Sequence, residues 1–302
     1  MIKILINTST FGNDNLKLLK NKKKFKFIIN KTGRKVSESY LKKNIKNVHA
    51  IIAGTEQYDS SILAYAKNLK LISRLGVGTD NIDLVFCKKN NIKVLTSKVD
   101  LSIGVAEQAL SLIFAGLKKI SYFDKSIKFG KWKKEYTSLL FRKKIGIIGF
   151  GKIGKKIYQL TKPFDLKYFY NDKIKISSNG LKFISIKSMF EKCDIITIHL
   201  PFNKRTHHII NKKVFPKKNS KIILVNTSRG QVINERDLIN FLYRNKQSFA
   251  GLDVFEKEPY EGKLKKLNNS ILTPHVSGYS LELRNLMEKE ALKNLLLKFG
   301  GS

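Results

Sequence analysis

Short apolar runs alternate with amphipathic stretches along the whole chain. Runs such as Ile2 to Ile6 and Phe25 to Ile29 are typical of buried strands, and the stretch around Tyr40 is typical of a helix. Because strands that alternate with helices form parallel sheets covered on both faces, the pattern predicts an α/β fold and disfavours a mixed α+β fold. The first series also predicts a helix at Leu16 to Leu19 and strands at Val48 to Ile52, Leu69 to Ser73 and Ile92 to Leu95.

The pattern changes near Val99. Val105 to Ile120 is the longest helical candidate, and its apolar residues are too numerous for one buried stripe. We therefore expect this helix to be buried on several sides, as a helix between domains or subunits would be. A polar, lysine-rich connector, Lys125 to Lys144, follows it. A second series of strands is then predicted at Ile145 to Ile148, Lys167 to Tyr170, Ile195 to His199, Ile222 to Val225, Phe249 to Leu252 and Ile271 to Leu272, before a helical tail from Leu281 to Phe299.

The composition is that of a globular protein, but the charge is unusual. The chain has 302 residues, of which 42% are hydrophobic and 27% charged, and a formal net charge of +36. Only 8 of the 59 basic residues are Arg, the residue that specific phosphate and base recognition favours, and the Lys residues are spread over nearly every segment. We attribute the charge mainly to compositional bias and do not expect specific nucleic-acid binding, although such a field would attract small anionic ligands.

The number and spacing of the cysteines and the length of the apolar runs indicate where in the cell the protein is located. Cys87 and Cys193 lie in unlike segments without CxxC spacing, which excludes a disulfide framework and a thiolate zinc site. Few cysteines suit a reducing cytosol, so a cytoplasmic location is expected. The apolar run at the N-terminus is too short for a signal peptide, and no stretch approaches the roughly 18 apolar residues of a membrane span. We therefore expect neither a membrane association nor a bound metal.

A glycine motif follows the first strand of the second series. In Gly149-x-Gly151-x-x-Gly154 the first glycine permits a tight turn, the second lets the backbone approach a pyrophosphate, and the third allows close helix–strand packing. The helix that follows presents free N–H groups to the anion. Asp172 closes the next strand, 23 residues after Gly149, where a carboxylate accepts hydrogen bonds from ribose hydroxyls and repels a 2′-phosphate. The motif predicts NAD rather than NADP, a preference that two adjacent lysines weaken.

Three further segments follow strands of the second series. They are VNTSRG (225–230), DVFEKEP (253–259) and TPHVSG (273–278). Ligands bind beyond the carboxyl ends of parallel strands, so an Arg, a Glu and a His at that edge can meet around one substrate. A cation for a carboxylate and carbonyl, an imidazole for the proton and a carboxylate that holds the imidazole suit the interconversion of a carbonyl and an alcohol.

These motifs, together with LISRLGVGTDNIDL (71–84), VAEQAL (105–110) and HLPFNKRT (199–206), resemble those of the D-isomer-specific 2-hydroxyacid dehydrogenase family, most closely its phosphoglycerate dehydrogenase type. The resemblance runs nearly from end to end. It implies two doubly wound parallel-sheet domains, a Rossmann nucleotide-binding domain (99–281) inserted into a flavodoxin-like substrate domain (1–98 and 282–302). It also implies an active site between the domains and a homodimer that packs through the nucleotide domain and its long helix. No regulatory domain is expected beyond Ser302.

The resemblance assigns the chemistry residue by residue. Arg229 would hold the substrate carboxylate and polarise the carbonyl, His275 would carry the hydroxyl proton, and Glu258 would hydrogen-bond and orient His275. Backbone N–H groups around Val77 and Gly78 would bind the substrate carboxylate. Contacts with the cofactor are implied for Gly149, Gly151, Lys152, Ile153, Gly154, Asp172, His199, Leu200, Pro201, Thr206, Thr227, Ser228, Arg229, Asp253, His275 and Gly278.

The implied function is an NAD-dependent oxidoreductase that interconverts a small 2-hydroxy acid and its 2-oxo acid by hydride transfer. The GVGTDNID segment and the basic field favour 3-phosphoglycerate, a substrate of serine biosynthesis. Two alternatives stay open: a glyoxylate or hydroxypyruvate reductase that uses the same residues, and a non-catalytic, NAD-sensing protein like the transcriptional corepressors that share the fold. Glu256 is offset from the family position and is expected to be a surface residue, and no role is expected for His49, His207 or His208.

Overall fold

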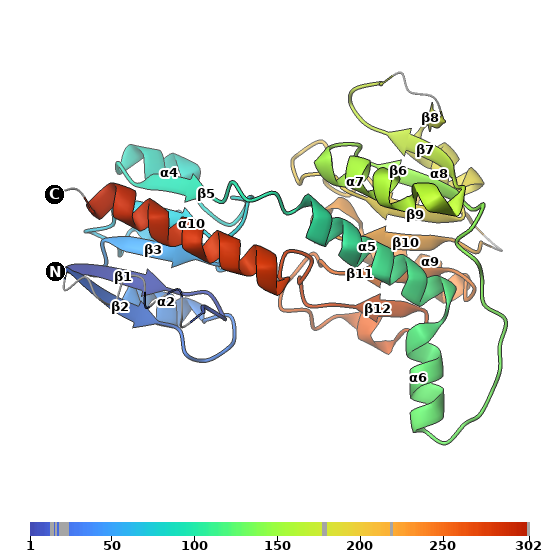
Figure 1. Ribbon diagram of the computed structural model, residues 1–302, viewed down its shortest axis with the longest axis horizontal. Helices are drawn as coiled ribbons and strands as arrows, with labels where there is room; N and C mark the ends of the chain where they lie inside the picture. The colour runs from blue at the N-terminus through green and yellow to red at the C-terminus, as the bar shows by residue number, and fades with distance from the viewer. Residues whose placement is uncertain (13–14, 16, 18–23, 177–179, 218–219, 301–302) are drawn as a thin grey trace. The chain divides into compact units, whose positions relative to one another are not determined.

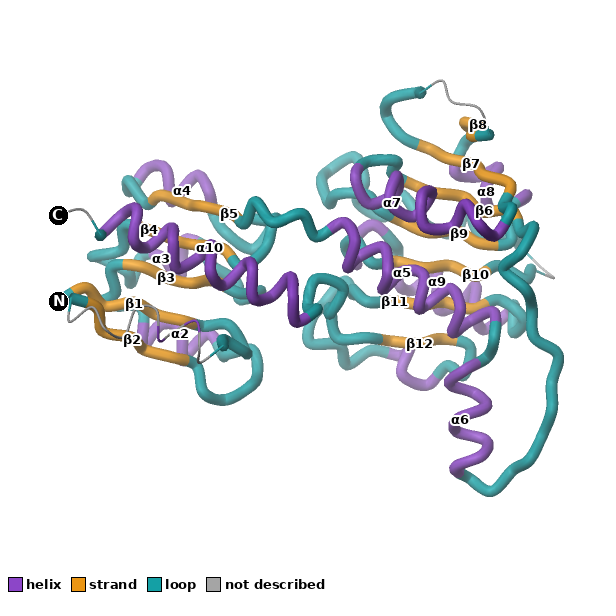
Figure 2. Tube along the Cα trace, in the orientation of Figure 1, coloured by secondary structure: helices purple, strands orange, loops and turns teal. Residues whose placement is uncertain are grey.

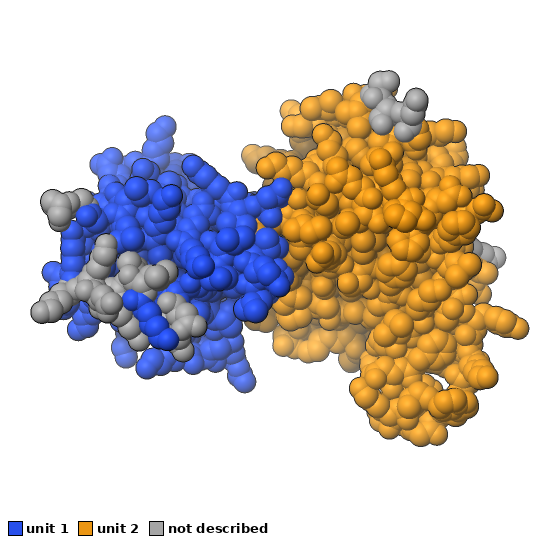
Figure 3. Space-filling model, viewed as in Figure 1, with its two compact units in different colours: residues 1–100, 279–302 blue, residues 101–278 orange. Residues whose placement is uncertain are grey.

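The computed structural model describes residues 1–12, 15, 17, 24–176, 180–217 and 220–300. The chain forms two compact units, which Figure 3 colours separately: residues 1–100 with 279–302, and residues 101–278. The expected boundaries, after residue 98 and before residue 282, lie close to these. The helix expected at Leu16 to Leu19 falls largely outside the described residues.

Unit 1 is built on a five-stranded sheet in which every pair of neighbours is parallel (Figures 1 and 2). The strand order, β2-β1-β3-β4-β5, is the flavodoxin-like order with its reversal beside β1. The C-terminal helix α10 (Leu281–Phe299) returns to pack against β4. The strands are β1 (Ile2–Ile6), β2 (Phe25–Ile29), β3 (Ala50–Ala53), β4 (Leu71–Arg74) and β5 (Lys93–Thr96), and the connecting helices are α2 (Glu38–Asn44), α3 (Ser60–Leu63) and α4 (Leu84–Lys89).

Unit 2 contains a seven-stranded parallel sheet of order β12-β11-β10-β9-β6-β7-β8. The order reverses between β6 and β9, which is where a doubly wound sheet opens a crevice for a dinucleotide. The prediction of two doubly wound α/β domains is confirmed. The strands are β6 (Lys144–Ile148), β7 (Lys167–Asn171), β8 (Leu181–Phe183), β9 (Ile195–Ile198), β10 (Ile223–Asn226), β11 (Phe249–Leu252) and β12 (Ser270–Leu272), and the helices are α5 (Ser102–Leu117), α6 (Ile120–Lys128), α7 (Lys152–Thr161), α8 (Ile186–Lys192) and α9 (Glu235–Arg244).

The long predicted helix is divided in two. It was expected to continue to Ile120, but α5 ends at Leu117 because Lys119 adopts a left-handed backbone conformation, with φ 52°. A new helix, α6, then occupies the start of the expected connector and projects from unit 2 in Figure 1. The several buried sides of α5 have a simple origin, since the helix packs on α7 and across β10, β11 and β12. Strand β8 has no apolar run to predict it, and its residues are mostly exposed.

Two strands of unit 1 begin later than their apolar runs. Val48 and Leu69 are buried, but they lie in the loops that lead into β3 and β4. An apolar run indicates which residues are buried, and in these two segments the buried residues begin before the hydrogen bonds between neighbouring strands do. No helix in the described part of the chain is long and apolar enough to cross a membrane.

Candidate active site

The candidate residues of unit 2 gather because the strands end in register. Ile148 pairs with Ile198, Ile198 with Asn226, and Leu252 with both Asn226 and Leu272. Since these strands are parallel, the loops that follow them leave from one edge of the sheet. The glycine motif, VNTSRG, DVFEKEP and TPHVSG segments therefore share that edge, although they are far apart in the sequence.

The glycine motif forms a turn in which side chains are excluded at two of its three glycines. Gly149 has φ +89°, and a Cβ there would lie 2.5 Å from the carbonyl oxygen of His199. A Cβ on Gly154 would lie 2.3 Å from the carbonyl oxygen of Gly149, so only glycine permits this close approach of helix and strand. At Gly151, the N-cap of α7, no atom lies within 4 Å of the Cβ position, which leaves the helix N-terminus open to a ligand.

Asp172 also stabilises this turn. Its Oδ2 accepts a hydrogen bond from the N–H of Phe150 at 2.6 Å, and its Oδ1 accepts one from Ile174 N–H at 3.3 Å. The carboxylate is half-buried beside the glycine motif, and its remaining lone pairs can still accept ribose hydroxyls. Lys152 and Ile153 form the first turn of α7, the position expected for residues facing a pyrophosphate.

Two buried polar atoms at this edge have no hydrogen-bond partner among the described residues: Nδ1 of His199 and Oγ1 of Thr227. Burial lowers the pKa of His199 to about 3, so the ring is neutral at pH 7. Its Nε2 lies 2.9 Å from Oγ1 of Thr197, which leaves Nδ1 for another group. Because buried polar atoms are nearly always paired in folded proteins, these two atoms mark places for a polar ligand. With the glycine turn, they fit a bound dinucleotide.

The loop after β10 is organised by a residue that sequence analysis left without a role. Asn226 accepts hydrogen bonds from the N–H and Oγ of Ser228, at 3.0 and 2.7 Å, and donates one to the carbonyl of Arg229 at 2.9 Å. The guanidinium of Arg229 donates to Ser228 O at 2.8 Å. A Cβ on Gly230 would lie 1.9 Å from the carbonyl carbon of Phe255, so the loops after β10 and β11 touch through their backbones.

Glu258 and His275 come together across the ends of β11 and β12. Oε2 of Glu258 lies 2.9 Å from Nδ1 of His275, and Oε1 accepts the N–H of Phe255 at 3.1 Å, which fixes the carboxylate. Both side chains are partly exposed, so the far nitrogen of the imidazole remains available to a substrate. This arrangement is an oriented imidazole that can exchange a proton, with Arg229 on the neighbouring loop.

Asp253, for which a cofactor contact is expected, is fully buried (0% exposed). Its carboxylate accepts hydrogen bonds from the segment that carries His275. Thr206 is likewise engaged in its own turn, where its Oγ1 donates to Pro201 O at 2.7 Å. Leu200 and Gly278 are half-buried, and Gly278 is the last residue of unit 2.

In unit 1 the expected anion-binding loop follows β4. Val77 is exposed, and Gly76 before it has φ +143°. A Cβ on Gly76 would lie 2.8 Å from Nη1 of Arg74, so the guanidinium lies over this glycine, two residues before Gly78. A buried carboxylate, Glu56, lies at the same edge of the sheet, beyond β3.

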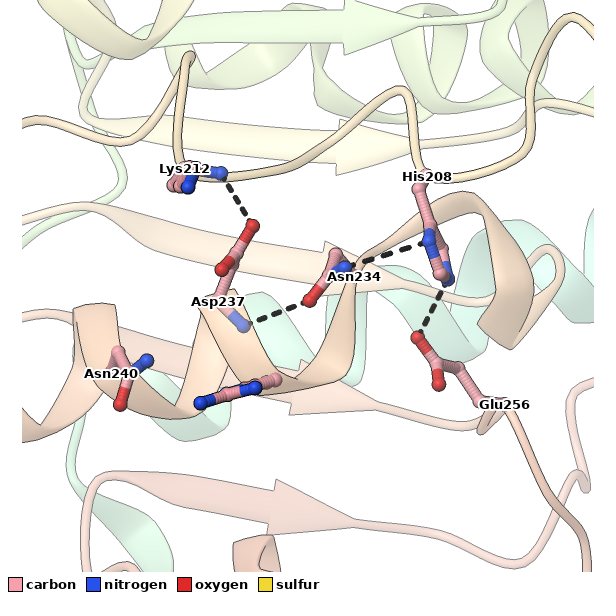
Figure 4. A pocket seen from close by; sticks show the side chains of 7 residues that line it. His208, Lys212, Asn234, Asp237, Asn240 and Glu256 are labelled. Atoms are coloured by element: carbon pink, nitrogen blue, oxygen red, sulfur yellow. Dashed lines mark hydrogen bonds and ion pairs between the residues drawn. The ribbon is translucent and has the colours of Figure 1, made fainter.

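Glu256 is exposed, as expected, but it has partners. Its Oε1 accepts the N–H of Glu235 at the start of α9 and lies 2.9 Å from Nε2 of His208. Figure 4 shows this contact at the rim of a surface pocket of about 570 Å³. Glu256 thus joins the loop that carries Glu258 to two other segments. None of the residues that line the pocket, His208, Lys212, Asn234, Arg236, Asp237, Asn240 and Glu256, was a predicted site residue.

Comparison with known proteins places this site in context. Residues 110–277 match the family model described as "D-isomer specific 2-hydroxyacid dehydrogenase, NAD binding domain". The chain is 31% identical to a hydroxypyruvate reductase from Thermotoga maritima, over 93% of this chain and 96% of the relative. It is 32% identical to a glyoxylate reductase from Thermofilum pendens, over 88% and 82%.

A D-3-phosphoglycerate dehydrogenase from Archaeoglobus fulgidus is 33% identical over 83% of this chain, but the match spans only 49% of that relative. Among solved structures, an NAD-dependent formate dehydrogenase from Staphylococcus aureus in complex with NAD superposes with a TM-score of 0.86 at 25% identity, covering 100% of this chain and 96% of the other.

Proposed function

The chain belongs to the D-isomer specific 2-hydroxyacid dehydrogenase family, and we propose that it reduces a small unphosphorylated 2-oxo acid, hydroxypyruvate or glyoxylate, with NADH. Membership of the family makes it an NAD-dependent dehydrogenase that acts on the CH–OH group of a 2-hydroxy acid. The observation that carries the site assignment is the 2.9 Å contact of Glu258 with His275 at the sheet edge that also holds the glycine turn.

The residues at the carboxyl edge of the unit 2 sheet have separate roles in the proposed reaction. The imidazole of His275 donates a proton to the carbonyl oxygen in reduction and takes it back from the hydroxyl in oxidation, while Glu258 holds the ring in one orientation. Arg229 holds the substrate carboxylate and stabilises negative charge on the carbonyl oxygen. Bound NADH supplies the hydride that reduces the 2-oxo carbon.

Residues at the same edge of the unit 2 sheet would bind the cofactor. Gly149, Gly151, Gly154 and the first turn of α7 would hold the pyrophosphate, and Asp172 the ribose. His199 and Thr227 would give their unpartnered polar atoms to the dinucleotide. In unit 1, the backbone N–H groups of Val77 and Gly78 would bind the substrate carboxylate.

The choice of substrate rests on how much of each relative is matched. The hydroxypyruvate reductase is matched over nearly its whole length, whereas the phosphoglycerate dehydrogenase is matched over about half. 3-Phosphoglycerate is the second candidate, because the net charge of +36 favours a more highly charged anion.

A substrate panel tests both candidates. Initial rates with NADH and NADPH are measured on hydroxypyruvate, glyoxylate, pyruvate and 3-phosphohydroxypyruvate. We expect the highest kcat/KM on hydroxypyruvate or glyoxylate, and a preference for NADH that the Asp172→Ala variant narrows. A higher kcat/KM on the phosphorylated acid would favour the second candidate. NAD binding without turnover of any acid would leave only a binding protein.

We also propose that the protein forms a homodimer through unit 2. Large apolar side chains are exposed on α6 and the segment after it, including Trp132 at 83% and Tyr136 at 98% exposure. Apolar side chains gathered in this way mark an interface between proteins. Sedimentation of the wild type and of the Trp132→Asp variant tests the proposal: a dimer that the variant dissociates is expected, and a monomeric wild type contradicts it.

The two free, buried thiols support a cytoplasmic location.

A further inference from the structure

One motif of the nucleotide-binding unit has no part in the function proposed so far. Gln108 lies in VAEQAL, in the second turn of α5, and its side-chain amide reaches the end of β12. Its Nε2 donates to Oγ1 of Thr273 at 3.2 Å, and Thr273 Oγ1 lies 2.5 Å from Oδ1 of Asp253. The contacts join a helix, the end of β12 and the end of β11.

The direction of each hydrogen bond follows from the donors available. The hydroxyl of Thr273 has one hydrogen, and a carboxylate can only accept, so Thr273 donates to Asp253 and accepts from Gln108. A chain of this kind, in which each bond polarises the next, is stronger than its separate bonds. Asp253 is the last acceptor in this series of hydrogen bonds, and it is fully buried.

The other hydrogen bonds that the carboxylate of Asp253 accepts from the described residues come from the turn that contains His275. Oδ1 accepts Val276 N–H at 2.9 Å, and Oδ2 accepts both Ser277 N–H, at 2.9 Å, and the Ser277 hydroxyl. The four donors fill the lone-pair sites of the carboxylate. Asp253 therefore fixes the turn on the C-terminal side of His275, and Thr273 fixes it on the other side.

The backbone of His275 needs this support. Its φ is +55°, a left-handed conformation that costs energy for a residue with a Cβ. Its N–H donates to Thr273 O at 3.0 Å, so Thr273 holds the turn through its backbone as well as through its hydroxyl. The surroundings hold His275 in a conformation that the residue alone adopts only rarely.

We propose that Gln108 and Thr273 are positioning residues that hold His275, through Asp253, in line with its partner Glu258. The proposal rests on the proposed function, because it concerns the residue that carries the proton. Helix α5 is a firm anchor: it packs across β10, β11 and β12, and a Cβ on Gly251 of β11 would lie 2.8 Å from Cβ of Leu112. Gln108 thus ties the turn that contains His275 to a packed helix and not only to other loops.

Matched variants test the proposal. Thr273→Val removes the hydroxyl with little change of shape, Thr273→Ser keeps it, and Gln108→Leu removes the donor on α5. Ser111→Ala, on the exposed side of the same helix, is the control, since among the described residues its hydroxyl hydrogen-bonds to Glu107 O alone. We expect kcat to fall about tenfold in Thr273→Val and less in Gln108→Leu, because misplacement of a reacting group slows the chemistry. Thr273→Ser should restore kcat, and the KM for NADH should stay unchanged in all of them.

A second readout does not depend on turnover. The ring ¹⁵N signals of His275, assigned with the His275→Gln variant, should shift in Thr273→Val and Gln108→Leu but not in Thr273→Ser or Ser111→Ala. Unchanged His275 signals in Thr273→Val, or a lower melting temperature with unchanged kcat per folded enzyme, would overturn the proposal. If the wild type turns over none of the acids, the proposed function fails, while the ¹⁵N signals still decide whether the chain of hydrogen bonds positions His275.

Discussion

Each unit has a buried carboxylate just beyond a strand at the carboxyl edge of its sheet, and the two differ in their donors. Asp253 in unit 2 is 0% exposed and Glu56 in unit 1 is 2% exposed. Asp253 accepts four hydrogen bonds from Thr273, Val276 and Ser277. Glu56 accepts one from Gly54 N–H at 3.1 Å and a long one from the hydroxyl of Tyr58 at 3.5 Å.

Equal burial therefore has unequal consequences. A buried carboxylate with a full set of donors can remain charged and act as a scaffold. Burial raises the pKa of Glu56, although hydrogen bonds from the backbone N–H groups of Glu56 and Gly54 and the charges of Lys35 and Arg74 oppose the rise. The carboxylate at the edge that holds His275 is fixed by four hydrogen bonds, whereas the edge beside the expected substrate loop contains a carboxyl group whose pKa burial raises.

The largest effect should come from the residue that the Asp253 edge holds in place. His275→Ala removes the proton carrier, so kcat should fall by a factor on the order of 10² to 10⁴. The affinity for NAD should change little, because the glycine turn and Asp172 are untouched. Steady-state kinetics and a binding titration on the same preparation measure both. Turnover close to that of the wild type would mean that another group carries the proton.

Asp253→Asn should cost the most stability of the single substitutions considered. An amide has one acceptor oxygen, so buried donors on one side of the residue would face an NH₂ group. We expect a loss on the order of 2–4 kcal/mol, since each unsatisfied buried donor costs about 1–3 kcal/mol. Urea unfolding measures it. A variant as stable as the wild type would contradict the role of Asp253 as a scaffold.

Gly230→Ala should separate the two loops of the same edge. The new Cβ would lie 1.9 Å from the carbonyl carbon of Phe255 and 2.4 Å from Glu256 N, and neither is a side chain that can move away. Stability should fall by about 1–3 kcal/mol and kcat should fall with it. Gly151→Ala is the matched control: it has open space, so its stability should stay within about 0.5 kcal/mol while NAD affinity drops. Equal losses of stability in both variants would contradict this explanation.

The sequence predicted most of the fold, because alternating apolar runs and helices leave few arrangements for a parallel sheet. It also predicted the meeting of Glu258 and His275, since motifs that follow parallel strands emerge at one edge. The break between α5 and α6 was missed, because periodicity does not reveal the left-handed conformation of Lys119. Apolar pattern likewise carries no information on which donors face a carboxylate.

Apart from the pairing of Glu258 with His275, the hydrogen-bond partners of polar residues could not be predicted from the sequence. Asn226 stands inside a predicted motif, but its three hydrogen bonds to the loop that contains Arg229 appear only in the folded chain. Glu56 lies in a segment without a recognisable motif, and nothing in the pattern predicts its burial. Residues that position a site are therefore harder to identify from one sequence than residues whose side chains can perform chemistry.

The smallest effect is expected at Glu56, and it lies in the pH dependence of stability. A carboxyl group with a raised pKa binds its proton more tightly in the folded state, so its contribution is full below the unfolded pKa, near 4.5, and is lost as pH rises through the folded pKa. The free energy of unfolding of the wild type should thus fall with pH across that window, relative to the Glu56→Gln variant. Urea unfolding of both proteins at matched pH values measures the difference, and other carboxylates cancel between them. Parallel curves would mean that burial does not raise the pKa of Glu56 in the folded protein, and the contrast between the two edges would disappear.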